Sequence, residues 1–449
     1  MRIARANAGR GRRLTALAAL GGLLVLAALS AGCGGRGAAS GPRRLVVIGI
    51  DSADWIPIDT LLAAGRMPAF RRLLDQGARA ELRSFEPLEK SPVLWASIAT
   101  GRKPQDHGIG GFVKEDAADG DQTPTRSNAW RAPAFWDVAN AAGLGRDVIG
   151  WWVTHPARPL RGVTVSDDLP CLVSREMQRQ GLVCPASLLG RVEALRRRPE
   201  EVTDADLGRF IDLTALARAP RTQVIDTALH ALRAIYAADL SYVRIGRWLA
   251  RRDDAPLFVI YLRGLDMVSH EFWRFWRTET SSAPPTADEL AIFGQVVPRY
   301  YQFVDEQVGE IVSWFPPDRQ LVVLSDHGFH GAYHRKRGWT HGTEDHRRMG
   351  IFLARSPLCA AGARGEPVDL LDAGPTILAL LGLPASKEMP GTPAPPGLTS
   401  AGRRFVKRLE RDRVPSYQTL APRAAGDAAV DPRVDEAIRR QLRSLGYIR

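Results

Sequence analysis

The chain has 449 residues, of which 45% are hydrophobic and 24% are charged, and its formal net charge is +12 at pH 7. This composition is ordinary for a globular protein, and the length suffices for a large core and two or three domains. Five of the positive charges belong to the first 13 residues, which leaves +7 for the remainder. No run of Lys and Arg with interleaved aromatic residues occurs, so the sequence shows no nucleic-acid-binding surface.

The first 32 residues have the pattern of a secretory signal peptide. Arginines at positions 2, 5, 10, 12 and 13 precede an apolar run, 14–29, which is followed by Ser-Ala-Gly and then by Cys33. The apolar run is short for a membrane span. A basic start, a short apolar stretch and small residues at its end are typical of an export signal.

The cysteine directly after Ala-Gly resembles the cleavage site of bacterial lipoproteins, in which this cysteine becomes the lipidated first residue. The resemblance implies an exported protein that is anchored in the membrane through a lipid on Cys33, on the periplasmic or cell-surface side. An ordinary signal peptide or an uncleaved anchor is the alternative, because Ser30 stands where the lipoprotein pattern prefers Leu. Residues 33–43, rich in Gly and Ala, are expected to form a flexible tether.

Short apolar runs that end in polar residues predict the strands of a mostly parallel sheet. The expected strands are 45–50, 147–152, 257–262, 321–324 and 351–354. Helical patterns are expected at 58–64, 68–76, from 91 onward, and at 223–251, 296–315 and 370–381. The strand at 147–152 ends in Trp151 and Trp152, which could line a substrate-binding wall or pack in the core.

Three further regions can be distinguished by their patterns. Residues 44–398 are predicted to form a catalytic-type domain. Within it, the alternation of strands and helices lapses at 156–255, which we expect to be a mainly helical cap inserted over the site. Residues 399–449 are rich in Arg and Ala and are expected to form a C-terminal tail.

Three cysteines follow the predicted lipidation site, at positions 171, 184 and 359. Export permits disulfides, and a bond between Cys171 and Cys184 would close a small loop. The sequence leaves open whether this bond forms. Cys359 is expected to be free and buried.

Residues that can bind metals follow several of the predicted strands. In an open α/β sheet, ligands bind beyond the carboxyl ends of the strands. The residues that follow these ends include Asp51, Asp266 with His270, and Asp326 with His327. Carboxylates and imidazoles are ligands of zinc-like cations, although a single Asp-Gly turn needs no metal. Five of the nine histidines fall between His327 and His346, a density that core packing does not require.

A serine precedes one of the expected helices. In Lys90-Ser91-Pro92, Ser91 is a suitable N-cap and Pro92 suits the first helical position. A hydroxyl at this place lies where free N–H groups and the helix dipole favour an anion. A capping serine with no further role is the alternative.

The order of these motifs resembles the alkaline phosphatase superfamily, and within it the type I phosphodiesterase/nucleotide pyrophosphatase branch. The motifs are Asp51, Lys90-Ser91, Asp266-x-x-x-His270, Asp326-His327-Gly328 and His346. The segments 100–109 and 374–384 also resemble that branch, so the resemblance covers 45–383. It implies an α/β fold with a mostly parallel central sheet and helices on both faces.

The resemblance also implies two divalent metal ions, zinc in most of the superfamily, with manganese as the alternative. One ion would be held by Asp51, Asp326, His327 and Ser91, and the second by Asp266, His270 and His346. His341 is the alternative to His346. Ser91 would attack phosphorus and form a phosphoseryl intermediate, while Lys90 and the N–H groups after Ser91 could bind the non-bridging oxygens.

Two positions depart from the pattern of that branch, which usually has Thr as nucleophile and Asn three residues later. This chain has Ser91 and Leu94 there, and the missing Asn puts nucleotide diesters in doubt. The Cys/Ser-x-Pro-x-Arg pattern of sulfatases is absent. The favoured function is therefore metal-dependent hydrolysis of phosphate esters, diesters above all. The alternatives are transfer of a phosphoryl-linked group to an envelope lipid or glycan, and a surface binding protein with a relict site.

Overall fold

The computed structural model describes residues 43–115, 122–171, 180–278, 284–331, 345–422, 435, 436 and 439. The predicted signal peptide, Cys33 and His341 lie outside these residues. Of the helices in the described ranges, none has the length and apolar character needed to cross a membrane.

Nine strands form one sheet in the order β13-β2-β12-β9-β1-β8-β5-β6-β7. Their bounds are β1 Leu45–Ile50, β2 Ala78–Arg83, β5 Arg146–Ile149, β6 Gly162–Val165, β7 Val183–Cys184, β8 Leu257–Leu262, β9 Gln320–Leu324, β12 Met349–Arg355 and β13 Val368–Asp369. β1 pairs in parallel with β8 and β9, and β5 pairs in parallel with β8 and β6. β12 runs antiparallel to both β9 and β2. The predicted mostly parallel sheet is thus confirmed.

Two small antiparallel pairs lie apart from this sheet. They are β3 (Val113–Glu115) with β4 (Gln122–Pro124), and β10 (Gly328–Phe329) with β11 (His346–Arg347). The second pair joins the two ends of the stretch between His327 and His346, in which five of the nine histidines fall. It therefore bears directly on the site described below.

The central strand β1 shows why continuous apolar runs mark the middle of the sheet. All six of its residues are buried. Val46, Ile48 and Ile50 belong to one core cluster, whereas Leu45 and Val47 belong to a second cluster on the other face. Because helices cover both faces of a parallel sheet, neither set of side chains can be polar.

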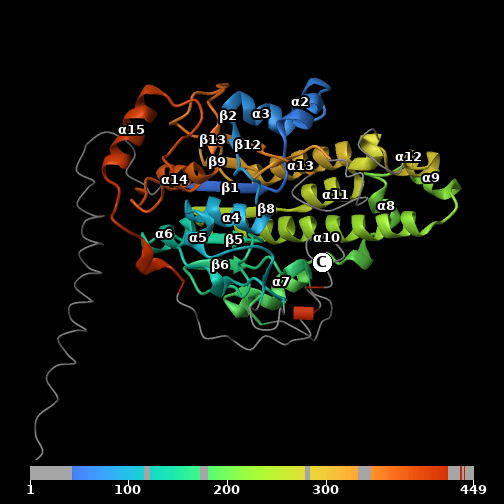
Figure 1. Ribbon diagram of the computed structural model, residues 1–449, viewed down its shortest axis with the longest axis horizontal. Coiled ribbons are helices and arrows are strands. Elements are labelled where there is room, and N and C mark those ends of the chain that lie inside the picture. The colour runs from blue at the N-terminus through green and yellow to red at the C-terminus, as the bar shows by residue number, and fades with distance from the viewer. Residues whose placement is uncertain are drawn as a thin grey trace, which may run out of the picture.

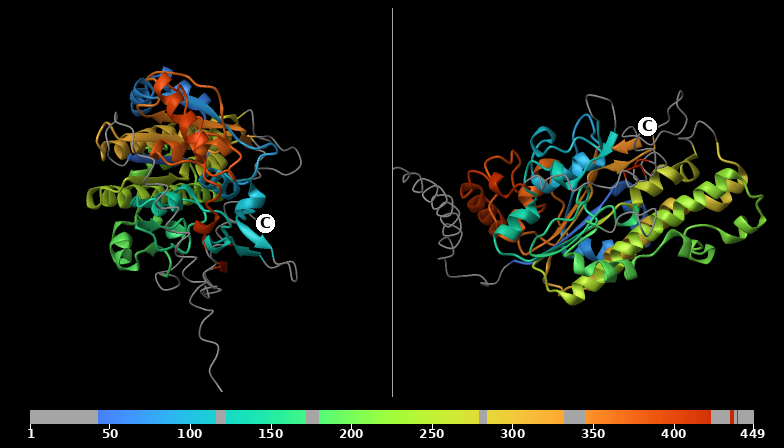
Figure 2. Two further views of the ribbon diagram at one scale, coloured as in Figure 1. Left: turned by 90° about the vertical axis from the view of Figure 1, so that its left-hand side faces the viewer. Right: turned by 90° about the horizontal axis from the view of Figure 1, so that it is seen from below.

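Helices lie on both faces of the sheet, as predicted (Figures 1 and 2). One core cluster draws on α2, α3, α10, α11, α12 and α13 and the other on α4, α6 and α14. The helices are α2 Trp55–Ala63, α3 Pro68–Gln76, α4 Ser91–Thr100, α5 Pro104–His107, α6 Phe135–Ala141, α7 Leu189–Leu195, α8 Asp204–Leu207, α9 Leu213–Arg218, α10 Gln223–Arg252, α11 Gly264–Trp276, α12 Ala287–Phe293, α13 Val296–Ser313, α14 Leu370–Leu381 and α15 Ser400–Arg411.

The region predicted to form a cap, 156–255, contributes to the sheet as well as to helices. It supplies β6 and β7, which extend one edge of the sheet. Its longest helix, α10, has 30 residues and packs against β8, β5 and α11 as part of one flanking layer. Cys184 is a free, half-buried thiol, and Cys359 is free and buried. The side chain of Cys171 lies outside the described residues.

The first part of the predicted tail is a folded helix. Thr399 caps α15 by accepting a hydrogen bond from the Gly402 amide, and Val406 and Leu409 are buried. Further along, the Tyr417 hydroxyl donates to the Pro384 carbonyl at 2.8 Å. This part of the chain therefore belongs to the body of the protein, at the end marked by the red helix α15 in Figure 1.

Candidate functional site

The adjacent strands β1, β8 and β9 deliver three aspartates to one edge of the sheet. β1 lies between the other two and runs parallel to both. Asp51 directly follows β1, Asp326 lies two residues beyond β9, and Asp266 lies in the first turn of α11, just beyond β8. All three carboxylates are at most 1% exposed. The structure thus brings these three carboxylates to one edge of the sheet.

The short pair β10 and β11 places His346 at the same edge. In its register Phe329 lies opposite His346, so His346 comes beside His327 although the two are 19 positions apart in the sequence. The two imidazole rings stack with their centroids 3.8 Å apart and their planes 16° apart. The side chain of His346 is only 5% exposed.

The side chains form two overlapping groups of potential metal donors. Asp266, His270 and His346 make one group, and Asp51, Asp266 and His327 make the other, with the donor atoms of each group within 4.8 Å of one another. Asp266 belongs to both. Its Oδ1 lies 3.4 Å from His270 Nε2 and 3.3 Å from His346 Nε2. Asp326 Oδ2 lies 3.5 Å from His327 Nε2, beside the second group.

Ser91 lies against this cluster at the start of α4. Its Oγ is 3.4 Å from both Asp51 Oδ1 and His327 Nε2, and the residue is 3% exposed. The helix begins at Ser91 itself, with Lys90 as the N-cap, so the predicted N-cap was one residue too late. Helix ends that are assigned by different criteria commonly differ by one or two residues.

The surroundings of Ser91 correct one expectation about the N–H groups that follow it. Pro92 has no N–H, and the amides of Val93 and Leu94 already donate to the Lys90 carbonyl at 2.9 and 3.1 Å. These groups are therefore not free to bind an anion. Lys90 is exposed, and its side chain lies beside Gly111.

Burial and mutual repulsion shift the pKa values of the carboxylates. Burial and then Asp266 raise the pKa of Asp51, while burial, Asp51 and Asp266 raise the pKa of Asp326 well above its ordinary value. Burial alone would raise the pKa of Asp266, but His270 and the neighbouring imidazole of His346 hold it well below the ordinary value. Acidic groups packed this closely are all ionised together only when positive charge lies among them.

The two histidines beside Asp266 are shifted in opposite directions. Burial by itself lowers the pKa of His270, yet Asp266 and Asp345 raise it to about 10. Burial and the neighbouring His327 lower the pKa of His346 to about 3. The site thus combines imidazoles with buried carboxylates. In their deprotonated forms, these groups are the N and O donors that zinc-like cations bind.

The surroundings of Asp326 also indicate that the donor set fits divalent cations. Among the described residues, neither oxygen of the buried Asp326 carboxylate accepts a hydrogen bond of ordinary geometry. A buried ionised group without such partners is costly. A cation held by these donors would supply the missing interaction.

Two residues at the site, Tyr261 and Asp345, were not identified as functional from the sequence, and Trp152 was named only as part of a substrate wall or of the core. The Tyr261 hydroxyl donates to Asp51 Oδ2, and Trp152 Nε1 lies 2.6 Å from that hydroxyl. Asp345 Oδ2 lies 3.7 Å from His270 Nδ1, on the side away from Asp266. The only sequence signal for Asp345 is its place directly before His346.

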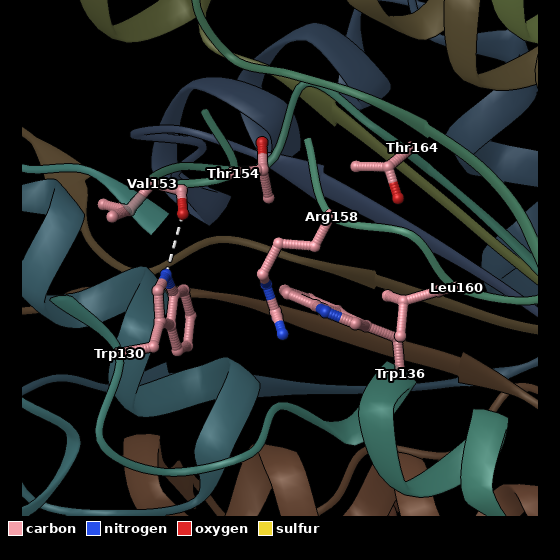
Figure 3. Close-up of a pocket in the computed structure, with 7 residues that line it drawn as sticks. All are labelled: Trp130, Trp136, Val153, Thr154, Arg158, Leu160 and Thr164. Carbon is pink, nitrogen blue, oxygen red and sulfur yellow. Dashed lines mark hydrogen bonds between the residues drawn. The ribbon is translucent and has the colours of Figure 1, made fainter. Parts of the chain in front are cut away.

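A small pocket lies apart from the metal-donor cluster. It is lined by Trp130, Trp136, Val153, Thr154, Arg158, Leu160 and Thr164 (Figure 3). Trp130 Nε1 donates to the Val153 carbonyl at 2.7 Å, and Arg158 forms an ion pair with Asp137 at 3.3 Å. None of the predicted site residues lines this pocket, so the chemistry is to be sought at the strand ends.

Comparison with known proteins identifies the family. The family model for type I phosphodiesterases/nucleotide pyrophosphatases matches residues 45–363. No curated protein shows significant similarity. Similar solved structures include human ectonucleotide pyrophosphatase/phosphodiesterase 5, at 11% identity and a TM-score of 0.44, over 78% of this chain and 97% of that one. The murine protein shares 13% identity at a TM-score of 0.43, over 85% of this chain and 100% of that one.

Phosphonoacetate hydrolase from Sinorhizobium meliloti, in complex with phosphonoformate, is also similar in structure. It shares 17% identity at a TM-score of 0.35, over 64% of this chain. The chain covers 57% of the length of that hydrolase. The family match extends over more than two thirds of the sequence, and it shows that the chain belongs to the type I phosphodiesterase/nucleotide pyrophosphatase family, a family of metal-dependent phosphoric ester hydrolases.

Proposed function

We propose that the protein hydrolyses phosphate esters with two metal ions and with the Ser91 hydroxyl as nucleophile. The observation that carries this proposal is the place of Ser91 Oγ, buried and 3.4 Å from two potential metal donors, Asp51 and His327. A free serine hydroxyl is a weak nucleophile and needs activation. A hydroxyl that serves only as a helix cap has no need of such neighbours.

The residues that would hold the ions are those that the family resemblance implies. Asp51, Asp326, His327 and Ser91 would hold one ion, and Asp266, His270 and His346 the other. Zinc suits this mixed set of carboxylates and imidazoles, and manganese is the alternative. When bound, such ions neutralise the phosphoryl oxygens and favour the ionised forms of a coordinated hydroxyl and of water.

The reaction would proceed in two displacements at phosphorus. Ser91 Oγ gives its proton to water and forms a bond to phosphorus as the bond from phosphorus to the leaving oxygen breaks, and the leaving group takes a proton from water. Water then attacks the phosphoseryl group, the Oγ–P bond breaks, and the serine hydroxyl is restored. Lys90, exposed at the start of α4, would attract the anionic substrate toward the site.

The substrate class is constrained by Leu94. Leu94 occupies the position at which the family's diesterases usually have a phosphate-binding Asn, and it is fully buried in the core. Leu94 has no side-chain amide that could contact the phosphate, which argues against a strong preference for nucleotides. We therefore propose phosphate diesters of the cell envelope as substrates. This agrees with the predicted export signal and the predicted lipid anchor on Cys33.

The proposal is tested by comparing p-nitrophenyl phosphate with bis-p-nitrophenyl phosphate. The full chain, purified in detergent and loaded with zinc or manganese, should turn over the diester faster. Ser91→Ala should lose at least about 10³-fold of this activity. Ser97→Ala is the matched control, because Ser97 is also a buried serine of α4 but bonds only to Val93 and His107.

Two results would contradict the proposal. The first is equal turnover by Ser91→Ala and by the unchanged chain. The second is a lack of turnover of every phosphate ester by the metal-loaded protein. If instead the diester forms a stable phosphoserine that is released only on addition of an alcohol acceptor, the enzyme is a transferase that uses the same serine.

A further inference from the structure

We infer that Trp152 and Tyr261 form a hydrogen-bonded relay that positions Asp51 for metal binding. The inference rests on the proposed function for the role of Asp51 as a ligand. The two oxygens of this carboxylate have different surroundings. Oδ1 faces the donor cluster, 3.4 Å from both Ser91 Oγ and His327 Nε2. Oδ2 accepts a hydrogen bond from the Tyr261 hydroxyl.

The direction of the relay is fixed by the chemistry of its members. An indole N–H can only donate. Trp152 Nε1 lies 2.6 Å from the Tyr261 oxygen, so that oxygen accepts, and Nε1 is also 3.5 Å from Asp51 Oδ2. The hydroxyl hydrogen of Tyr261 is then left for Asp51. Oδ2 is thereby engaged as an acceptor, whereas Oδ1 has no donor from the relay and faces the cluster of potential metal donors.

The packing around Tyr261 holds the relay in place. Tyr261 is 1% exposed, and its ring meets Trp95 edge to face with centroids 4.8 Å apart. On β1, Gly49 lies directly opposite Tyr261 in the strand register. A Cβ at Gly49 would come within 3.0 Å of the Tyr261 ring. The glycine therefore makes the space that the tyrosine fills, and the ring cannot turn away without repacking of β1.

Packing against Phe112 holds the Trp152 ring in place. Trp152 is 9% exposed, and its ring packs against Phe112 with centroids 5.4 Å apart. Of the two interpretations of this residue from the sequence, substrate wall or core, its burial favours core. Its N–H nevertheless reaches the site. Gly150 and Val153, on either side of Trp152, have positive φ angles of 71° and 60°, a conformation that is uncommon for a non-glycine residue such as Val153.

The expected consequence is a change in metal affinity. Partners that hydrogen-bond to a metal ligand typically account for about 10–100-fold in metal affinity or activity. Without the Tyr261 hydroxyl, Oδ2 would be buried without its donor, and the carboxylate could rotate away from the geometry that binds the ion. The loss should fall on the ion that Asp51 holds and spare the other one.

The test measures metal binding directly, without substrate. The full chain in detergent is titrated with zinc in competition with a chromophoric chelator. The variants are Tyr261→Phe and Trp152→Phe. The matched control is Tyr242→Phe, since Tyr242 is also fully buried but donates to the backbone carbonyls of Ser166 and Asp167 at 3.1 and 3.0 Å.

We expect Tyr261→Phe to bind one of two zinc ions about 10–100-fold more weakly and the other with unchanged affinity. Trp152→Phe should weaken the binding of the same ion to a smaller extent. Tyr242→Phe should leave the affinity for both ions unchanged. Wild-type affinity for both ions in Tyr261→Phe, or an equal loss in Tyr242→Phe, would overturn the inference. Should Tyr261→Phe fail to fold, wild-type affinity in Trp152→Phe would overturn it. Because no ester is involved, this result stands apart from the outcome for Ser91.

Discussion

His107 is a buried histidine whose contacts specify a single protonation state. Its Nδ1 accepts a hydrogen bond from the Ile109 amide at 3.1 Å. Its Nε2 lies 3.0 Å from Ser97 Oγ, which itself donates to the Val93 carbonyl. Ser97 must therefore accept from Nε2–H, and the ring has room for one proton only. Burial lowers the pKa of His107 to about 4.

This pKa predicts how stability depends on pH. The unfolded chain takes up a proton at His107 below about pH 6.5, whereas the folded chain resists it down to about pH 4. The contribution to stability is thus complete above pH 6.5 and is lost progressively as the pH falls toward 4. Between pH 7.5 and 5 we expect His107 to account for about 2 kcal/mol of lost unfolding free energy.

The measurement is urea unfolding at both pH values, beside His107→Gln. The variant keeps an N–H that can reach Ser97 but has no group that titrates in this range. It should lose about 2 kcal/mol less than the unchanged chain over the same interval. If the unfolding free energies of the two proteins fall equally between pH 7.5 and pH 5, His107 takes up a proton in the folded state without loss of stability.

The residues of the site differ in how far the sequence reveals them. Asp51, Asp266 and Asp326 follow apolar strands, so strand ends alone predict that they meet. His346 could be placed only by family resemblance, because the pairing of β11 with β10 has no sequence pattern. Tyr261 lies within a buried strand and looks like core, and its role depends on where its hydroxyl points.

At the scale of elements, helix α3 depends on a cap supplied from elsewhere in the chain. Its N-cap residue, Met67, offers no side-chain hydrogen bond. The first free amides of the helix, at Ala69 and Phe70, donate instead to Asp305 of α13 at 3.0 and 2.7 Å. Asp305 is 1% exposed. The charge also suits the positive end of the helix dipole.

Replacing Asp305 should therefore destabilise the protein without affecting metal binding. Asp305→Ala leaves two buried amides unsatisfied, and we expect the unfolding free energy to fall by about 2–4 kcal/mol. Asp305→Asn, which retains an acceptor, should cost less. Glu306→Ala is the control, since its side chain is 57% exposed in a surface ion pair with Arg209 and should matter little. Equal losses in the Asp305→Ala and Glu306→Ala variants, measured by urea unfolding, would contradict the capping role.

The same contrast between local and distant interactions explains which elements the sequence predicted. The strands β1 and β8 have the predicted bounds because each is an unbroken apolar run buried on both faces. β2 was missed because it alternates buried residues with partly exposed Arg79, Glu81 and Arg83, and charged residues are uncommon in strands. β7 has only two residues, too few to form any pattern.

At the scale of the whole molecule, the two apolar core clusters and the buried aspartates come together at the carboxyl edge of the sheet. Residues of β1, β8 and β9 contribute to the clusters on both faces, and these clusters flank the edge. Three carboxylates with little access to water lie between them. In the absence of a cation, this region opposes folding, because burial of uncompensated charge is costly. Divalent ions would turn it into a link between strands that are far apart in sequence.

Metal removal should therefore lower the stability of the entire chain. An ion present at 100 times its dissociation constant stabilises the folded state by about 2.7 kcal/mol, and two ions by roughly twice that. For a protein of this size, chelation should lower the thermal midpoint on the order of 5 °C. Scanning calorimetry with zinc and after chelation checks this expectation.

Two variants separate the sources of this shift. Ser91→Ala should keep most of the zinc-dependent stabilisation, because the six Asp and His donors remain. Asp266→Asn should lose more of it, since Asp266 is a proposed ligand and its carboxylate lies among the donors of both groups. If the midpoint of the unchanged chain is the same with and without zinc, the buried aspartates persist as protonated acids, and the edge of the sheet needs no cation to fold.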